Sequence, residues 1–123
     1  MTESNMYRYI CETPDVLKSI MENRKAITEE FVDCFKDKEI RQVYVLGSGT
    51  SYHAGLSAKK YLEELLNLKV FNLYPTQFAR NEKIFEKHTL VIGMSQGGQS
   101  LSTVEGLDSA RERGLMTAAV SEN

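Results

Sequence analysis

The sequence predicts an α/β fold: a doubly wound parallel sheet with helices on both faces, preceded by an N-terminal helical arm. Three observations support this. From about residue 42 onward, short β-branched runs alternate with segments of helical period, the runs are apolar on both faces, and two of them end in loops rich in glycine and serine. Strands buried on both faces are typical of parallel sheets, because the crossover helices cover both sides.

The first expected element is a helix near residues 14–36. Thr13 can cap its free amides, and Pro14 suits the first turn, where its missing N–H costs nothing. Apolar residues recur at helical spacing along one face, which we expect to pack against another surface and to bury the Cys34 thiol. This face consists of Leu17, Ile20, Ile27, Phe31 and Cys34 or Phe35.

Seven further elements follow, alternating between strand and helix. The expected strands cover residues 43–46, 69–74, 89–94 and 115–120, and the expected helices cover 50–66, 76–81 and 100–113. Gly114 provides a C-terminal cap for the last helix. The chain stops just beyond a strand of buried type, so we expect the domain to be truncated after its fourth strand. The expected division is an arm at residues 1–38 and an α/β domain at 39–123.

Composition and charge narrow the classes of partner. At 123 residues, with 41% hydrophobic and 26% charged residues, the chain fits a single folded domain. A net charge of -2 gives no overall basic field, so we expect no nucleic-acid partner. No apolar run reaches the length of a membrane span or a signal peptide, so we expect a cytoplasmic protein without membrane attachment. Cys11 and Cys34 lack the spacing of metal ligands, and we expect no metal site.

Two loops follow strands at the expected carboxyl edge of the sheet, Gly47 to Tyr52 and Ser95 to Ser100. Ligands of open parallel sheets bind at this edge, where helix N-termini supply free amides and a partial positive charge. Glycines let the backbone approach an anion, hydroxyls donate to phosphate oxygens, and the Gln96 amide can bind sugar hydroxyls. The candidate binding residues are Gly49, Thr50, Ser51, Ser95, Gln96, Gly97 and Ser100.

Plainer roles for the same residues stay open at this point. Ser51 and Ser100 can be helix caps that satisfy free amides without any ligand, and Gly97 with Gly98 can form a structural turn. His53 is expected to face solvent or to pack along its helix rather than to carry protons. His88 precedes a strand and so lies away from the ligand edge.

Other glycine motifs do not fit the sequence. The string from Gly47 to Tyr52 begins like the dinucleotide motif GxGxxG, but Tyr52 takes the place of the third glycine. The P-loop signature GK[ST] does not occur, and no acidic cluster near the loops suggests magnesium. We therefore expect no cofactor and no nucleotide hydrolysis.

In combination, three motifs resemble the sugar isomerase (SIS) domain, specifically the first such domain in the isomerase half of glucosamine-6-phosphate synthase. The family's first loop, CGTSYxxG, corresponds to Ser48 through Tyr52 with Gly55 in place, and its second loop, SQSGET, to Ser95 through Ser100. The arm motif MxxxIxExP is present as Met6, Ile10, Glu12 and Pro14. The resemblance covers nearly the whole chain.

The resemblance implies a flavodoxin-like, three-layer sheet of about five strands that binds hexose 6-phosphates. It places Ser51, Ser95, Gln96 and Ser100 on the phosphate and Thr50 near the sugar. Two positions depart from the family: Gly97 replaces a serine, which removes a hydroxyl but keeps the amide, and Gln99 replaces an acid. Both departures bear on phosphate affinity and on ligand choice.

The resemblance also implies that this chain is the first of a pair of such domains. The glutamate, histidine and lysine that act on the sugar in that family lie in other parts of the protein, so we expect no catalytic residue here and no activity of this chain alone. The parent protein is expected to be an isomerase, aminotransferase or deaminase of hexosamine or fructosamine phosphates. Because the sequence starts with Met1, Thr2 and Glu3 directly before the arm, glutamine hydrolysis is not implied.

Two other functions stay open. The first is a non-catalytic sensor of sugar phosphates, which is disfavoured because the N-terminal residues predict one long helix and no helix-turn-helix module. The second is a structural half-domain that forms dimers. The apolar face of the first helix favours a homodimer or a higher homo-oligomer.

Overall fold

The structure, a computed structural model, describes residues 4–122. Met1 to Glu3 and Asn123, on which the expected start of the arm and end of the domain fall, lie outside the described residues. The chain divides into two units, Met1–Lys38 and Glu39–Asn123. Helix α1 (Asn5–Phe35) makes up the first unit, and the α/β fold makes up the second.

Four parallel strands form the sheet of the second unit. They are β1 (Gln42–Leu46), β2 (Lys69–Leu73), β3 (Thr89–Met94) and β4 (Met116–Val120), in the order β2-β1-β3-β4. Three helices connect them, α2 (Thr50–Leu66), α3 (Pro75–Asn81) and α4 (Leu101–Glu112). The predicted doubly wound α/β fold is therefore confirmed, with four strands in this chain where the family resemblance implied about five.

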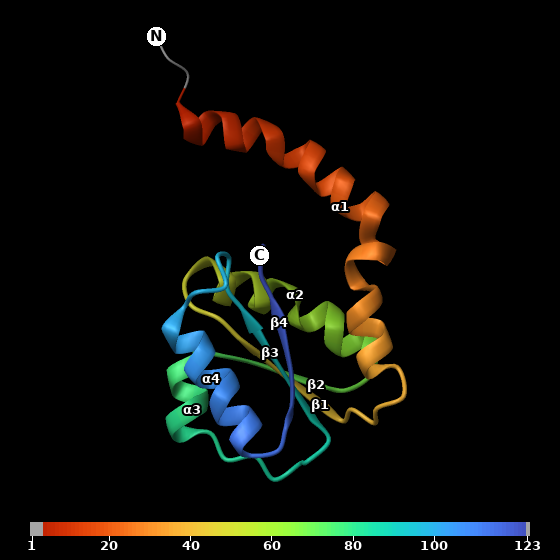
Figure 1. The fold of residues 1–123 in the computed structure, drawn as a ribbon, viewed down its shortest axis with the longest axis vertical. Coiled ribbons are helices and arrows are strands. Elements are labelled where there is room, and N and C mark those ends of the chain that lie inside the picture. The colour runs from red at the N-terminus through yellow and green to blue at the C-terminus, as the bar shows by residue number, and fades with distance from the viewer. Residues whose placement is uncertain (1–3, 123) are drawn as a thin grey trace. The chain divides into compact units, whose positions relative to one another are not determined.

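The helices cover the two faces of the sheet in the expected three layers. On one face, Tyr44 and Leu46 of β1 pack with Phe78 of α3 and Leu107 of α4 in the main buried cluster. On the other face, Gly55 of α2 lies so close to Val45 that an added Cβ would come within 2.9 Å of its Cγ1. Figure 1 shows α3 and α4 together on one side of the strands and α2 on the other.

The strand order creates a switch point between β1 and β3. After β1 the chain turns to β2 on one side, and after α3 it returns to β3 on the other side of β1. The register places Leu46 beside Gly93, so the loops that begin at Gly47 and Ser95 leave the sheet one residue apart. In open α/β sheets the crevice for a ligand forms at this place, because the following helices diverge to opposite faces.

Helix α1 differs from its predicted form. It begins at Asn5, so Pro14 lies inside the helix and Thr13 is not its N-cap; the Thr13 hydroxyl instead donates to the Tyr9 carbonyl at 2.9 Å. The prediction treated proline as a start signal, but an exposed helix tolerates the lost N–H because water can bind the freed carbonyl. Cys34 was predicted to be buried and is exposed.

The apolar face of α1 stays exposed within the part of the chain that the structure describes. Leu17 is 57% exposed, Ile27 61% and Phe31 40%, and α1 contains no buried residue. Despite this exposed face, no helix between residues 4 and 122 combines the length and the hydropathy that a membrane span needs. Exposed apolar faces of this kind are typical of interaction surfaces.

Strand β4 is less covered within the described residues than β1 and β3 are. Ala119 and Val120 are exposed, Val120 by 54%, while the first three residues of the strand are half-buried. The reason is position, since β4 is an edge strand that pairs only with β3 among the described residues. An apolar run alone does not reveal whether a strand lies inside a sheet or at its edge.

A buried tyrosine ties the sheet to the segment after α3. The Tyr44 hydroxyl donates to the Glu82 carboxylate at 2.8 Å, and its ring stacks on Phe71 with a centroid distance of 4.7 Å. Burial, followed by the hydrogen bond to Glu82, raises the pKa of the Tyr44 hydroxyl above its usual value. The phenol therefore remains a donor throughout the neutral range.

We expect Tyr44→Phe to lower the free energy of unfolding by about 1 kcal/mol, because it removes this hydrogen bond and keeps the ring packing. Urea denaturation followed by circular dichroism measures the change. The matched control is Tyr61→Phe on α2, where the side chain is 66% exposed and the expected change is within about 0.5 kcal/mol. Equal effects of the two substitutions would contradict a stabilising role for the Tyr44 hydroxyl.

Candidate functional site

The loop after β1 brings the first turn of α2 close to the end of the strand. An added Cβ at Gly47 would lie 2.9 Å from the Ser51 carbonyl carbon and 3.0 Å from the Tyr52 nitrogen, so only glycine permits this approach. Gly49 has a φ of +57° and occupies the N-cap position, where it reverses the chain direction into the helix. As a result, the free amides at the start of α2 lie at the carboxyl edge of the sheet.

Neighbouring contacts hold the start of α2 in place. The Asn72 side-chain amide on β2 donates to the Tyr52 carbonyl at 3.0 Å. The Tyr52 ring stacks on Tyr74, with centroids 4.3 Å apart and ring planes 8° from parallel. Because these contacts come from β2 and the residue that follows it, the first turn of α2 is fixed to the sheet without using the hydroxyls of Thr50 and Ser51.

The loop after β3 is held by the end of β4. The Ser95 amide donates to the Val120 carbonyl at 3.1 Å, and the Glu122 amide donates to the Gln96 carbonyl at 2.9 Å. Gly98 has a φ of +68°, whereas Gly97 has no such constraint, and an added Cβ at Gly97 would meet nothing within 4 Å. The turn therefore requires glycine at position 98 only, and a structural turn does not account for Gly97.

The two loops meet in one hollow of about 370 Å³ at the carboxyl edge of the sheet. This volume lies within the usual range of small-molecule sites. The start of α2, the end of β3 and the segment after β4 all contribute to its walls. The lining residues are Thr50, Ser51, Ala54, Met94, Ser95, Gln96, Val120, Ser121 and Glu122.

The structure brings some of the predicted binding residues together and leaves others outside. Thr50, Ser51, Ser95 and Gln96 line the hollow, but Gly49, Gly97 and Ser100 do not. The Ser100 hydroxyl lies 3.2 Å from that of Ser102 and accepts a hydrogen bond from the Thr103 hydroxyl, also at 3.2 Å. Ser100 thus belongs to a small hydroxyl cluster in the first turn of α4.

The helix-cap interpretation of the serines does not match the contacts. The N-cap of α2 is Gly49 and not Ser51, so Ser51 lies in the first turn of the helix. Ser100 does occupy the N-cap position of α4, but its side chain makes no capping hydrogen bond. The free amides at both helix starts therefore retain their capacity to bind an anion.

Sequence reasoning missed the third wall of the hollow. Ser121 and Glu122 follow β4 as the other two loops follow β1 and β3, and both lie in the hollow with Val120. The rule that placed the first two loops at the ligand edge applies equally to the end of the fourth strand. The same rule therefore predicts that the segment after β4 lies at this edge.

The charges around the hollow favour a small anion at its α2 end. The start of α2 contributes about half a positive charge and free N–H groups. Among the residues from 4 to 122 that line the hollow, Glu122 alone is charged, and it lies on the β4 side. His53 is exposed on α2 with its ring edge-on to Tyr52, and it does not line the hollow. Within residues 4–122, no three histidine, cysteine, aspartate or glutamate side chains gather as metal ligands would.

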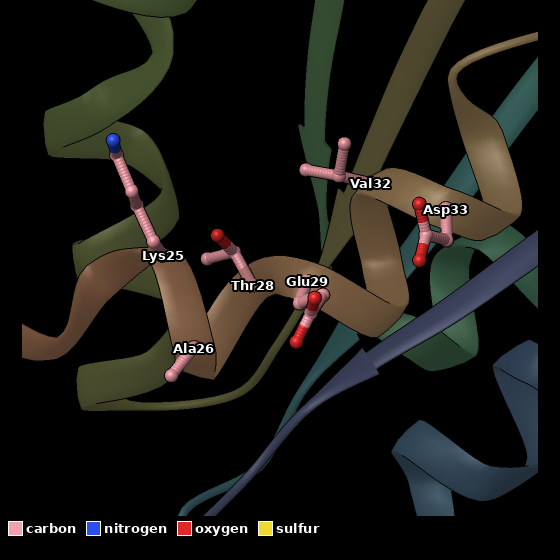
Figure 2. A pocket seen from close by; sticks show the side chains of 6 residues that line it. All are labelled: Lys25, Ala26, Thr28, Glu29, Val32 and Asp33. Atoms are coloured by element: carbon pink, nitrogen blue, oxygen red, sulfur yellow. The ribbon is translucent and has the colours of Figure 1, made fainter.

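A second hollow of about 440 Å³ lies along α1, but it lacks the features of a binding site. Figure 2 shows its six lining side chains, which all come from successive turns of one helix. Lysine, glutamate and aspartate account for half of them, and no loop or second element closes the space. The lining residues are Lys25, Ala26, Thr28, Glu29, Val32 and Asp33.

The fold and the hollow together define a class of protein, a doubly wound α/β domain with a hollow at its switch point. The profile of the SIS domain matches residues 38–123 of this chain. The chain belongs to the SIS domain family.

Several relatives give the family match more detail. The glutamine--fructose-6-phosphate aminotransferase (isomerizing) of Clostridium tetani is 32% identical over 122 residues, which cover 94% of this chain and 20% of the relative. The enzyme of the same name from Aquifex aeolicus is 33% identical over 114 residues, covering 85% of this chain and 19% of the relative. This chain thus spans about a fifth of the length of the curated relatives that it matches.

Solved structures agree in fold. A proposed phosphosugar isomerase from Clostridium difficile 630 superposes with a TM-score of 0.86 at 31% identity, covering 98% of this chain and 34% of that one. The C-terminal domain of the glucosamine-fructose-6-phosphate aminotransferase of Francisella tularensis has a TM-score of 0.65 over 69% of this chain and 24% of its own; at 19% identity it shows the fold alone. The chain is therefore related to the isomerase part of these aminotransferases and to phosphosugar isomerases.

We expect Gly47→Ala to destabilise the chain by about 1–3 kcal/mol, since the new methyl group would press on the backbone of Ser51 and Tyr52. Thermal unfolding measures the effect. The control is Gly97→Ala, for which the structure leaves open space and no positive φ, so that its melting temperature should stay the same or rise slightly. If Gly47→Ala melted like the control, the close approach of α2 to β1 would not be required.

Proposed function

We propose that this chain is the phosphosugar-binding domain of an isomerase-, aminotransferase- or deaminase-type enzyme that acts on hexosamine or fructosamine 6-phosphates. One observation carries the proposal: the hydroxyl-rich ends of β1 and β3 share a single hollow at the switch point of the sheet. The names of the relatives, which include aminotransferases of fructose 6-phosphate, support this class of ligand.

The polar groups suggest how the ligand would bind. Ser51, the first-turn amides of α2 and the Ser95 hydroxyl would together hold the phosphate, and we call these groups the phosphate cradle. Thr50 and the Gln96 amide would bind sugar hydroxyls, which both accept and donate hydrogen bonds. Gly49 and Gly97 would contribute backbone N–H groups only.

Ser100 has a different place in this proposal. The family resemblance puts it on the phosphate, whereas its hydroxyl is engaged with Ser102 and Thr103 at the start of α4. It would reach a ligand only from that cluster. The direct phosphate contacts are therefore assigned first to Ser51 and Ser95.

The chemistry of the parent protein would come from other parts of its chain. The residues that line the hollow include no histidine or lysine, the side chains most suited to proton transfer and Schiff-base formation on a sugar. Since the aminotransferase relatives are about five times longer than the matched segment, such groups have ample room elsewhere in the parent protein. The chain alone would bind sugar phosphates without converting them.

A sensor role remains the alternative. A regulator that couples sugar-phosphate binding to DNA would need a DNA-reading module, and residues 5–35 form one continuous helix in place of two crossing helices. The exposed apolar face of α1 supports a homodimer or a higher homo-oligomer as the working state. We also propose that the protein works in the cytoplasm, because the sequence contains no apolar run of the length of a signal peptide or a membrane span.

Ligand-induced stabilisation tests the proposal. We expect fructose 6-phosphate, glucosamine 6-phosphate or fructosamine 6-phosphate to raise the melting temperature of the chain, because a ligand that binds only the folded state stabilises it by about 2.7 kcal/mol at a hundred times its Kd. Unphosphorylated fructose is the control and should have no effect. A lack of any shift with all three phosphates would rule out the enzyme and the sensor alike.

Substitution of a single hydroxyl tests the phosphate cradle. We expect Ser51→Ala to weaken sugar-phosphate binding about tenfold, because a hydrogen bond to a charged group contributes about 1.5 kcal/mol. Isothermal titration calorimetry measures the Kd. Ser57→Ala on the same helix is the matched control, since its exposed hydroxyl donates to the His53 carbonyl and does not line the hollow. Equal affinities for the two variants would remove Ser51 from the cradle.

A further inference from the structure

The segment after β4 places one negative charge, that of Glu122, in a hollow whose other lining residues among positions 4–122 are neutral. Glu122 lines the hollow, and its backbone amide donates to the Gln96 carbonyl at 2.9 Å. This hydrogen bond holds the Glu122 backbone beside the second loop. The remaining lining residues carry hydroxyl, amide or apolar side chains, so none of them neutralises this carboxylate.

A carboxylate next to an anion site weakens the binding of the anion, because the two negative charges repel each other. A phosphate at the start of α2 is attracted by the helix dipole and repelled by Glu122. Selection for phosphate alone would favour a neutral or basic residue at this position. The acid therefore indicates that the ligand carries a positive charge in addition to its phosphate.

The spacing of the strands sets the distance between the positive start of α2 and the Glu122 carboxylate. The start of α2 follows β1, and Glu122 follows β4, two positions away in the order β1-β3-β4. Neighbouring strands lie about 4.8 Å apart, so the two ends of the hollow are separated by roughly 10 Å. A six-carbon sugar with its phosphate at one end and a substituent near the other spans a hollow of this size.

Resting on the proposed function, we propose that Glu122 is a specificity-determining residue that selects sugar phosphates bearing a protonated amino group near the carbonyl end of the sugar. The phosphate binds at the start of α2, and the ammonium group pairs with the Glu122 carboxylate. Gln96, whose carbonyl holds the Glu122 backbone, lies between the two ends and binds the hydroxyls of the sugar.

A matched pair of ligands and a matched pair of variants test this role. Glucose 6-phosphate and glucosamine 6-phosphate differ in one group, a hydroxyl or an amine on the second carbon. Glu122→Gln removes the charge and leaves the backbone hydrogen bond to Gln96 in place. Glu112→Gln removes the same charge at the end of α4, about 18 Å along the helix from its start. Calorimetric titration gives six affinities, one for each of the two ligands with the unsubstituted chain and with each of the two variants.

We expect the unsubstituted chain and Glu112→Gln to bind glucosamine 6-phosphate about two- to fivefold more tightly than glucose 6-phosphate, the range given by one exposed ion pair. Glu122→Gln should reduce this ratio to about one and leave the affinity for glucose 6-phosphate unchanged or slightly higher. Higher salt should also reduce the ratio in the unsubstituted chain, because salt screens an exposed pair.

Two results would overturn the assignment while leaving the proposed function intact. One is equal binding of the two ligands by the unsubstituted chain. The other is a preference for the amine that persists in Glu122→Gln. If neither sugar phosphate bound the unsubstituted chain, the proposed function itself would be wrong, and the role of Glu122 would fall with it.

Discussion

The parallel pairing of β1 with β3 is the constraint on which the site depends. Because β2 and β3 lie on opposite sides of β1, the chain leaves the central strands in two directions, and the helices that follow cover opposite faces. Two loops that are more than forty residues apart in the sequence then start one residue apart at the same edge. The hydroxyls, the free amides and the hollow between them all follow from this one pairing.

Close backbone contacts hold both loops at the carboxyl edge of the sheet. Gly47 lets the first turn of α2 rest on the end of β1, and Asn72 and Tyr74 hold the turn from the β2 side. On the other side, the end of β4 holds the second loop through backbone hydrogen bonds to Ser95 and Gln96. Since backbone and neighbouring side chains fix both loops, the hydroxyls of Thr50, Ser51 and Ser95 are left for a ligand.

Predictions from the sequence succeeded where a local pattern has a single physical cause. Alternating apolar runs and helical periods predicted the strands and helices after residue 42 to within one residue at each end, and Gly114 ends α4 with a φ of +74° as a C-terminal cap does. They failed where one signal has two causes. Pro14 is compatible with a first turn and with the interior of an exposed helix, and only the structure shows which of the two it occupies.

By itself, the sequence determined the parallel α/β class and the two glycine- and serine-rich loops as the candidate site, because periodicity, turn residues and helix starts are local properties of the chain. Only the tertiary structure decided which residues share the hollow. It brought Ser121 and Glu122 in beside Ser51 and Gln96, and left Ser100 among the hydroxyls of α4. The physical reason is that neighbours across a parallel sheet are set by strand order and register, which depend on the packing of all four strands together.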